Sequence, residues 1–337
     1  MQTHDEWITG GYEDLELSTQ LLAKAALRRG YSVEVLDRGA NFIRVSGKDR
    51  IEYVRQATRT RADSYISPLV MENKKVTKLI LAESGIRVPE GRDYAKLETM
   101  LRDFPFWQRQ GKIVVKPNTT NFGVAVSILD SPLTLDDFTR ACKSAFDEDE
   151  SVLAEEFIEG KEYRFLVIDG ITRAALHRVP ANVTGDGASS VGELIEFKNA
   201  DPRRGERYRS PLEKIRTGAE EELCLRAQGL DFDSVIGPGT TVYLRQNSNI
   251  STGGDSIDFT DLIHPGYGDI ASASAAAVGA KICGVDMMIA DTEAEPDERN
   301  YAIIELNFNP ALHIHDFPFS GKNRAVEKYV LDALELR

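Results

Sequence analysis

Acidic and amide side chains gather in the last third of the chain, on two segments with strand-like sequences. Asp286 lies in the run GVDMMI, while Glu305 and Asn307 lie two residues apart in AIIELNF. Side chains two apart on a strand point to the same face of a sheet. Oxygen ligands without His or Cys suit magnesium, and a carboxylate among apolar neighbours needs a compensating charge. A metal site is one interpretation of these residues, and a solvated acidic surface is the other.

Lysines near a glycine-containing loop form a second candidate group. Lys116 ends the apolar run IVVK and is followed by a loop that reaches Gly123. A lysine beside such a loop can neutralise nucleotide phosphates while the loop covers them. Lys74 and Lys78 lie one turn apart on a predicted helix. The alternatives are a surface lysine with its stem on apolar surface, and a solvated helix face.

The run AEEFIEGKEYRF, residues 154–165, places acidic residues around a short apolar turn. Backbone next to Phe157 and Ile158 can take an adenine, and Glu162 can accept hydrogen bonds from ribose hydroxyls. Taken alone, the run is an acidic hairpin.

Arginines and a glycine pair could contact anions. Arg164, Arg178 and Arg245 alternate with apolar or strand residues, so each guanidinium suits either bidentate binding of phosphate or carboxylate or a structural ion pair. The run NSNISTGGDS, residues 247–256, packs small polar side chains around two glycines whose backbone amides can approach an anion. A plain loop is the commoner meaning of such a run.

The elements that must position these residues alternate between helices and strands. Hydrophobic spacing predicts helices at 17–29, 71–85, 133–149 and 271–282. Branched and aromatic runs predict strands at 31–37, 41–47, 51–55, 112–117, 125–130, 152–158, 163–170, 284–290 and 301–309. A turn-rich connection is predicted from 178 to 205. The pattern indicates an α+β fold: a small α/β segment at 1–67, then a larger domain at 68–337 with a lid at roughly 112–170.

Length and composition restrict the partners. A chain of 337 residues indicates two or three lobes with a cleft, and its net charge of −13 disfavours nucleic acid or anionic membrane as the main partner. No apolar run is long enough to span a bilayer, and the start MQTHDEWITGG lacks a secretory h-region, so a cytoplasmic protein is expected. The three cysteines lack CxxC spacing and are interpreted as core residues or free thiols. His313 and His315, on a predicted strand, are interpreted as structural.

Taken in this order, these pieces resemble the ATP-grasp fold, in which a nucleotide is held between two α+β lobes. More closely, the chain resembles the glutathione synthetase portion of bacterial bifunctional glutamate-cysteine ligase/glutathione synthetases. The resemblance extends from about Gly11 to Arg324 and is carried by EYVRQATRT, SYISPLVMENKKVTK, KPNTTNFG, EEFIEGKEYRF, RVPANVTGDG, LRQNSNISTGGDSID, CGVDMMI and IELNFNPALHIHDFPFSGK. Two of these strings are also similar to the ATP-grasp part of cyanophycin synthetase.

The resemblance implies a role for each matched residue. Phosphates would lie on Lys74 and Lys116 under a lid ending at Gly123, and Arg245 would steady the transferred phosphoryl group. The remaining implied contacts are adenine and ribose at Glu155, Glu156, Phe157, Ile158 and Glu162; magnesium, with manganese as the alternative, at Asp286, Glu305 and Asn307; and the acceptor or acyl phosphate at Arg178, Asn249, Ser251, Gly253, Gly254 and Asp255.

The implied activity is ATP-dependent joining of a carboxylate and an amine through an acyl phosphate, with glutathione synthesis from γ-glutamylcysteine and glycine as the first expectation. Only some tens of residues precede the matched region, so the dipeptide is expected to come from a separate ligase. The alternatives are a ligase for another amino acid pair or γ-glutamyl dipeptide, and a nucleotide-binding protein without catalysis. The expected partners are small amino acid or dipeptide substrates, with a homodimer as the commonest assembly.

Overall fold

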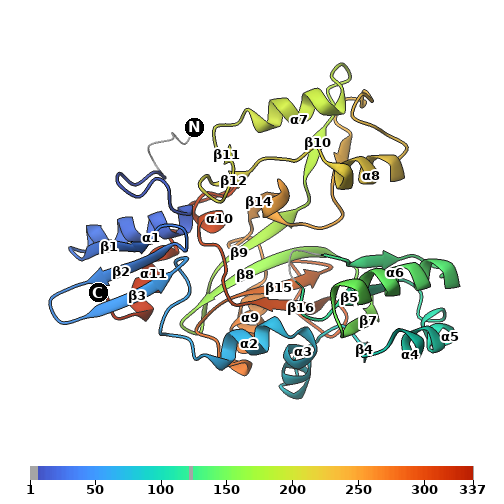
Figure 1. Ribbon diagram of the computed structural model, residues 1–337, viewed down its shortest axis with the longest axis horizontal. Coiled ribbons are helices and arrows are strands. Elements are labelled where there is room, and N and C mark those ends of the chain that lie inside the picture. Colours follow the sequence, from blue (N-terminus) through green and yellow to red (C-terminus); the bar gives the residue numbers. More distant parts are fainter. Residues whose placement is uncertain (1–6, 121–123, 337) are drawn as a thin grey trace.

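The computed structural model describes residues 7–120 and 124–336. At its centre is a five-stranded antiparallel sheet with the strand order β14-β9-β8-β15-β16. These strands are β8 (Lys161–Ile168), β9 (Ile171–Val179), β14 (Asp255–Asp258), β15 (Ile282–Ile289) and β16 (Tyr301–Asn307). Figure 1 shows three smaller units around this sheet: the N-terminal strands of residues 32–55 on one side, the four-stranded sheet with the helix at 135–148 on the opposite side, and the helices at 191–199 and 219–227 along a third.

Side-chain alternation gives the central sheet two different faces. On β8, Phe165 and Val167 pack into an apolar core with α9 (Pro265–Ala277). Leu166 and Ile168 point to the opposite face, where they meet the N-terminal unit. Because residues two apart share a face, Arg164 lies on the same face as Leu166. That face is therefore apolar at one end of the strand and charged at the other.

The N-terminal unit consists of one helix on a three-stranded sheet, as the sequence predicts. Its elements are α1 (Leu17–Arg28), β1 (Ser32–Asp37), β2 (Phe42–Ser46) and β3 (Ile51–Arg55). Gly30, with φ +82°, follows the helix in the left-handed conformation that glycine adopts without strain. The unit shares a core with the central sheet and with α11 (Glu327–Ala333). The domain boundary near Ser67 stays a prediction.

A four-stranded sheet, ordered β4-β7-β5-β6, carries the predicted lysine strand and acidic run. Its strands are β4 (Gly91–Tyr94), β5 (Ile113–Pro117), β6 (Ser127–Leu129) and β7 (Val152–Glu156), and its helices are α4 (Leu97–Arg102), α5 (Phe104–Trp107) and α6 (Leu135–Glu148). These elements share one apolar core. The predicted lid range 112–170 stays a prediction; it covers β5 to β7 and also β8, which lies in the central sheet.

Several local predictions are wrong. The helix predicted at 71–85 is present as α3 (Lys74–Glu83), but Met71 and Glu72 belong to a separate helix, α2 (Ile66–Glu72), because the Asn73 side chain accepts a hydrogen bond from Val76 N and caps α3. The residues His313 and His315 lie on a short helix, α10 (His313–Asp316), and not on a strand, although both are buried as structural residues would be.

The turn-rich connection from 178 to 205 contains regular structure. Ser190 and Glu193 form a capping box at the start of a helix there. The third unit comprises β10 (Asn182–Thr184), α7 (Val191–Asn199), β11 (Arg204–Gly205), β12 (Leu212–Glu213), α8 (Ala219–Ala227) and β13 (Thr241–Tyr243), with a 3₁₀ turn at Ile250–Thr252.

The cysteines are free, as predicted. Across the described ranges, we find no helix with the length and apolar character needed to cross a membrane.

Candidate active site

Three charged residues lie side by side on three neighbouring strands of the central sheet. Asp286 on β15 is the register partner of Arg164 on β8 and of Glu305 on β16. Cross-strand partners present their side chains on the same face. Asn307, two residues beyond Glu305, joins them, with its Nδ2 3.2 Å from Asp286 Oδ2 and 3.3 Å from Glu305 Oε1. The predicted cluster of Asp286, Glu305 and Asn307 is therefore formed.

A β-bulge puts Glu305 on this face. Register runs from Asp286 opposite Glu305 directly to Met287 opposite Ile303, so Ile304 is an extra residue on β16. Ile303 consequently packs into the apolar core on the α9 side, while Glu305 points to the charged face. Strict alternation without the bulge would place Glu305 on the same side as Ile303, in the apolar core.

Asp286 is the centre of the charged cluster and is 1% exposed. Arg164 donates to both of its carboxylate oxygens, with Nη2 2.6 Å from Oδ2. Arg178 Nη1 lies 3.4 Å from the same oxygen. Burial alone raises the pKa of Asp286, but the two guanidiniums outweigh burial and hold the pKa below its ordinary value. The carboxylate is therefore ionised and engaged by cations.

Gly284 makes room for this arginine. A Cβ at Gly284 would lie 2.9 Å from Arg164 Cδ and 3.3 Å from its Nε. The Arg164 side chain therefore passes over a position where any other residue would collide with it. Glycine here is explained by this close approach and not by backbone conformation.

Arg178 links the charged cluster to two other predicted residues. It forms an ion pair with Glu162 at 2.5 Å, and its Nη2 lies 3.4 Å from Asn249 Oδ1. Ser248 also donates to Glu162. Burial raises the pKa of Glu162, and the charge of Arg178 opposes that shift. The structure thus brings Glu162, Arg178 and Asn249 together beside Asp286.

A second cluster surrounds Glu155 on β7. Lys116 Nζ lies 2.8 Å from Glu155 Oε2, and Lys78 from α3 donates to the other oxygen. Burial raises the pKa of Glu155, but the two ammonium groups outweigh it and hold the pKa below its usual range. Burial also lowers the pKa of Lys78 to about 7. One carboxylate therefore holds two lysine side chains drawn from different structural units.

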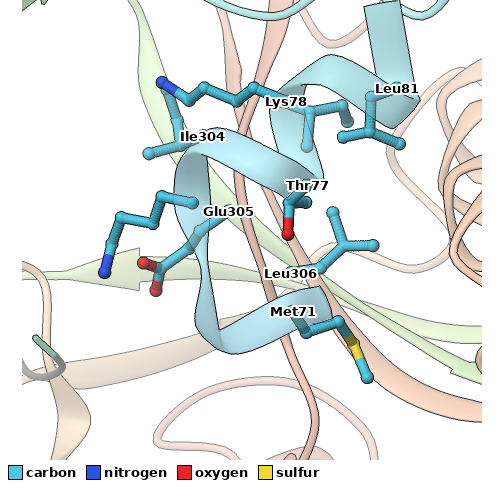
Figure 2. Close-up of a pocket in the computed structure, with 9 residues that line it drawn as sticks. Met71, Thr77, Lys78, Leu81, Ile304, Glu305 and Leu306 are labelled. Carbon is cyan, nitrogen blue, oxygen red and sulfur yellow. The ribbon is translucent and has the colours of Figure 1, made fainter. Parts of the chain in front are cut away.

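Lys74 and Glu305 connect the two clusters. Lys74 donates to the backbone carbonyls of Asn118 and Thr120, so its charge is held by the loop after β5. Burial lowers the pKa of Lys74, while the negative charge of Glu305 raises it. Both residues line a narrow cleft between α3 and β16. Figure 2 shows the polar ends of Lys78 and Glu305 on one side of this cleft and the apolar side chains of Leu81 and Leu306 on the other.

The donor set of Asp286, Glu305 and Asn307 fits a divalent cation. All three supply hard oxygen atoms, and the hydrogen bonds of Asn307 show that the side chains converge. The described residues contain no group of three or more His, Cys, Asp or Glu arranged to hold a metal ion, so the amide of Asn307 is needed to complete the set. Asp286 would have to exchange an arginine contact for the metal.

The predicted adenine residues form the connection from β7 to β8. Glu156 accepts hydrogen bonds from Arg87 at 2.6 Å and from Glu90 N at 2.8 Å, and Phe157 N donates to Lys112 O. Ile158 follows in the same connection and is half-buried. These residues join the four-stranded sheet to the central sheet, and their contact with an adenine stays a prediction.

The predicted glycine run is a compact turn. A Cβ at Gly253, where φ is +95°, would lie 2.5 Å from Ile215 Cα, and one at Gly254 would lie 2.7 Å from Val179 O. Asp255 at the end of the turn is buried in ion pairs with Lys198 and Arg204. The Asp255 carboxylate therefore anchors the turn, and its contact with substrate stays a prediction.

Three other predicted residues lie apart from the two clusters or outside the described residues. Arg245 forms ion pairs with Glu220 and Glu221 of α8, the latter at 2.5 Å. Ser251 lies near the Tyr208 hydroxyl. Gly123 lies outside the described residues. The roles predicted for these residues are not tested by these contacts.

Two residues of the clusters were given no specific role in the sequence prediction. For Lys78 the sequence offers a weak phosphate-binding candidate or a solvated helix face; in the structure, Lys74 and Lys78 lie on the side of α3 that faces β7 and β16. Arg164 was left between anion binding and an ion pair, and the ion pair with Asp286 is formed. The sequence feature that could have indicated this role is Gly284 in a predicted strand. A glycine in a strand often marks a place where a neighbouring group approaches closely, and here that group is the Arg164 side chain.

Comparisons with known proteins identify relatives along nearly the whole chain. The profile of a family described as "ATP-grasp-like domain" matches residues 13–66. Curated relatives named glutathione biosynthesis bifunctional protein GshAB are 54% identical over 96% of the chain in Clostridium perfringens and 49% identical over 99% in Desulfotalea psychrophila. The chain spans 42% and 43% of their lengths.

A solved structure gives the same result. The crystal structure of a bifunctional glutathione synthetase from Pasteurella multocida is 40% identical, with a TM-score of 0.76, and the match covers 98% of this chain and 46% of that one. The α+β arrangement predicted from the sequence is confirmed. The chain has the ATP-grasp fold and is homologous, over nearly its whole length, to a part of the bifunctional glutathione biosynthesis proteins.

Proposed function

We propose that this chain joins a carboxylate to an amine with consumption of ATP, and that its reaction is the synthesis of glutathione from γ-glutamylcysteine and glycine. The observation that carries the proposal is the convergence of Asp286, Glu305 and Asn307 beside a lysine cluster. The names of the relatives support the choice of substrates.

The metal is proposed to be magnesium, with manganese as the alternative, because the donor set consists of hard oxygen atoms. When bound, it would neutralise charge on the phosphate oxygens. Asp286, Glu305 and Asn307 would hold it.

The residues of the chain would act on the phosphates and the substrate. Lys74 would exchange its backbone carbonyls, and Lys116 its bond to Glu155, for phosphate oxygens. The substrate carboxylate attacks the γ-phosphorus and ADP leaves; the amine then attacks the acyl carbon, the carbon–oxygen bond to phosphate breaks, and the amine loses a proton. These reaction steps need no covalent nucleophile from the protein.

The cleft must widen for this reaction. Its lining side chains leave almost no free volume between them, whereas ligand pockets typically enclose about 300–1,000 Å³. Because Lys116 lies on the four-stranded sheet and Asp286 on the central sheet, separation of the two sheets would open the site. The β7 to β8 connection is the segment that would bend.

The proposal is tested by release of ADP and phosphate from the purified chain. The assay contains magnesium and ATP with γ-glutamylcysteine and glycine, and in parallel with pools of free amino acids. Turnover with the dipeptide and glycine supports the proposal. Turnover only with other pairs keeps the ligase reaction and replaces the substrates, whereas no ADP release with any pair favours a nucleotide-binding protein without catalysis.

A further inference from the structure

Arg59 lies close to the candidate site without an ion-pair partner among the described residues. Its guanidinium carbon lies 5.0 Å from the centre of the Phe308 ring, and its buried Nε has no hydrogen-bond partner. The carboxylates that act on it electrostatically are Glu16 and Glu72, and neither is within ion-pair distance. A half-buried guanidinium without a counter-charge is unfavourable in a folded protein.

A second arginine increases this positive charge. Arg55 exchanges two backbone hydrogen bonds with Arg59. Burial and, after it, the charge of Arg55 lower the pKa of Arg59. An arginine keeps its proton, so the repulsion is not relieved by deprotonation. Carboxylates are in excess in this chain, with 54 acidic and 41 basic residues, yet among the described residues none forms an ion pair with Arg59.

The backbone before Arg59 is strained and tied to the end of β16. Gln56 and Ala57 are consecutive non-glycine residues in the left-handed region, with φ of 51° and 64°. The Thr58 hydroxyl lies 2.9 Å from Asn309 Oδ1, and Asn309 Nδ2 lies 3.3 Å from Gln56 Oε1. Such strain persists where surrounding contacts enforce it, and it is concentrated at ligand sites.

These contacts locate Arg59 between the ends of two elements of the site. Phe308 directly follows Asn307, and Glu72 precedes Lys74 by two residues. Resting on the proposed function, we propose that Arg59, with Arg55 beside it, binds the carboxylate of the dipeptide substrate that does not react. In γ-glutamylcysteine this is the glutamyl α-carboxylate, which stays free when the cysteinyl carboxylate is activated. A guanidinium suits this group because it can bind a carboxylate through two hydrogen bonds.

Arg173 provides a matched control. It also lies over an aromatic ring, 4.0 Å from the centre of Tyr329, and its Nε is also buried without a partner. It differs in place, because it lies on β9 and packs against α11, away from β16. If the loss of any stacked arginine weakened substrate binding, replacing Arg173 would therefore have the same effect as replacing Arg59.

The test compares Arg59→Met, Arg59→Lys and Arg173→Met with the unchanged protein. We expect Arg59→Met to raise the KM for γ-glutamylcysteine about tenfold or more, the usual loss when a charged hydrogen bond is removed, without raising the KM for ATP. Arg59→Lys should restore part of the loss. The unchanged protein should also prefer γ-glutamylcysteine to 4-aminobutyrylcysteine, which lacks the glutamyl α-carboxylate, and Arg59→Met should lose that preference.

An unchanged KM and preference in Arg59→Met, or an equal loss in Arg173→Met, would overturn the assignment. The proposed function fails separately if the unchanged protein does not turn over the dipeptide with glycine. Calorimetric titration of γ-glutamylcysteine into the protein, with ADP and magnesium present, then decides the Arg59 assignment. Weaker binding to Arg59→Met alone supports it, and equal heats for all variants overturn it.

Discussion

Glu155 and Asp286 are both buried carboxylates held by cations, but the cations differ. Glu155 is paired with two lysines, and Asp286 with two arginines. An ammonium group is a compact point charge on a flexible stem whose pKa shifts on burial, as that of Lys78 does. A guanidinium stays charged and holds a fixed fork geometry. The lysine cluster is therefore suited to exchanging partners, and the arginine cluster to alignment.

The positions of the two clusters reinforce this difference. Lys78 comes from α3, whereas Lys116 and Glu155 come from the four-stranded sheet. Arg164 and Asp286 are register partners within one sheet. Separation of the sheets would change the contacts of Glu155 and leave those of Asp286 in place.

The largest effect is expected at Glu305, which lies between the two clusters. Its charge acts on both Lys74 and Arg164. Loss of a charge that stabilises the transition state typically lowers turnover about 10²- to 10³-fold, and we expect this for Glu305→Gln in the ADP-release assay. Thermal unfolding should stay close to that of the unchanged protein. Glu293→Gln, at an exposed carboxylate, is the control, and full activity in Glu305→Gln would remove the proposed metal site.

Glu155→Gln and Asp286→Asn test whether both carboxylates are required counter-charges. Removing one partner from a buried ion pair typically destabilises a protein by about 3–5 kcal/mol, and both variants should lose stability of this order in urea unfolding at pH 6. A loss below about 1 kcal/mol, the range of exposed pairs, in either variant would show that its cations have other partners.

The pH dependence of stability should distinguish the two clusters. The pKa of Lys78 is lowered from 10.5 to about 7, so between these values the unfolded chain binds a proton that the folded chain lacks. Stability from this group therefore rises with pH in that window, by about 1.4 kcal/mol per unit, and is lost as pH falls through 7. The difference in unfolding free energy between the unchanged protein and Lys78→Met should follow this slope. A constant difference from pH 7 to 10 would contradict it.

A smaller effect is expected at Gly284. A methyl group there collides with Arg164 Cδ, and overpacking typically costs about 1–3 kcal/mol, so Gly284→Ala should lose about that much stability. In an Arg164→Ala background the same change should have almost no effect, because the colliding side chain is absent. Equal losses in the two backgrounds would show that Arg164 is not the cause.

The sequence predicted most elements because hydrophobic period and turn residues agree with them, as at β1 to β3. It missed α7, although Ser190 and Glu193 have capping-box spacing, because glycines and prolines around them indicated turns. It also extended α3 back to Met71 and missed most of α2, which the side-chain cap of Asn73 separates from α3. These errors come from local signals of similar strength.

Residue types and their spacing predicted which residues gather at the site, but not which strands and side chains they pair with. Glu305 and Asn307 share a face as their spacing predicts, but the bulge at Ile304 that selects the face depends on pairing with β15. The partners of Asp286 likewise depend on strand register, and the two-residue alternation along one strand does not predict how that strand pairs with others. The strained turn before Arg59 is fixed by contacts with Asn309, which lies 251 positions after Thr58 in the sequence.

The central claim is that a substrate carboxylate becomes an acyl phosphate, and transfer of ¹⁸O tests it most directly. The cysteinyl carboxylate of γ-glutamylcysteine is labelled with ¹⁸O, and the phosphate released during turnover with glycine is analysed by mass spectrometry. Because the carboxylate oxygen bonds to the γ-phosphorus and leaves with it, the account predicts one ¹⁸O in each phosphate formed. Amide formation that releases only unlabelled phosphate would contradict it.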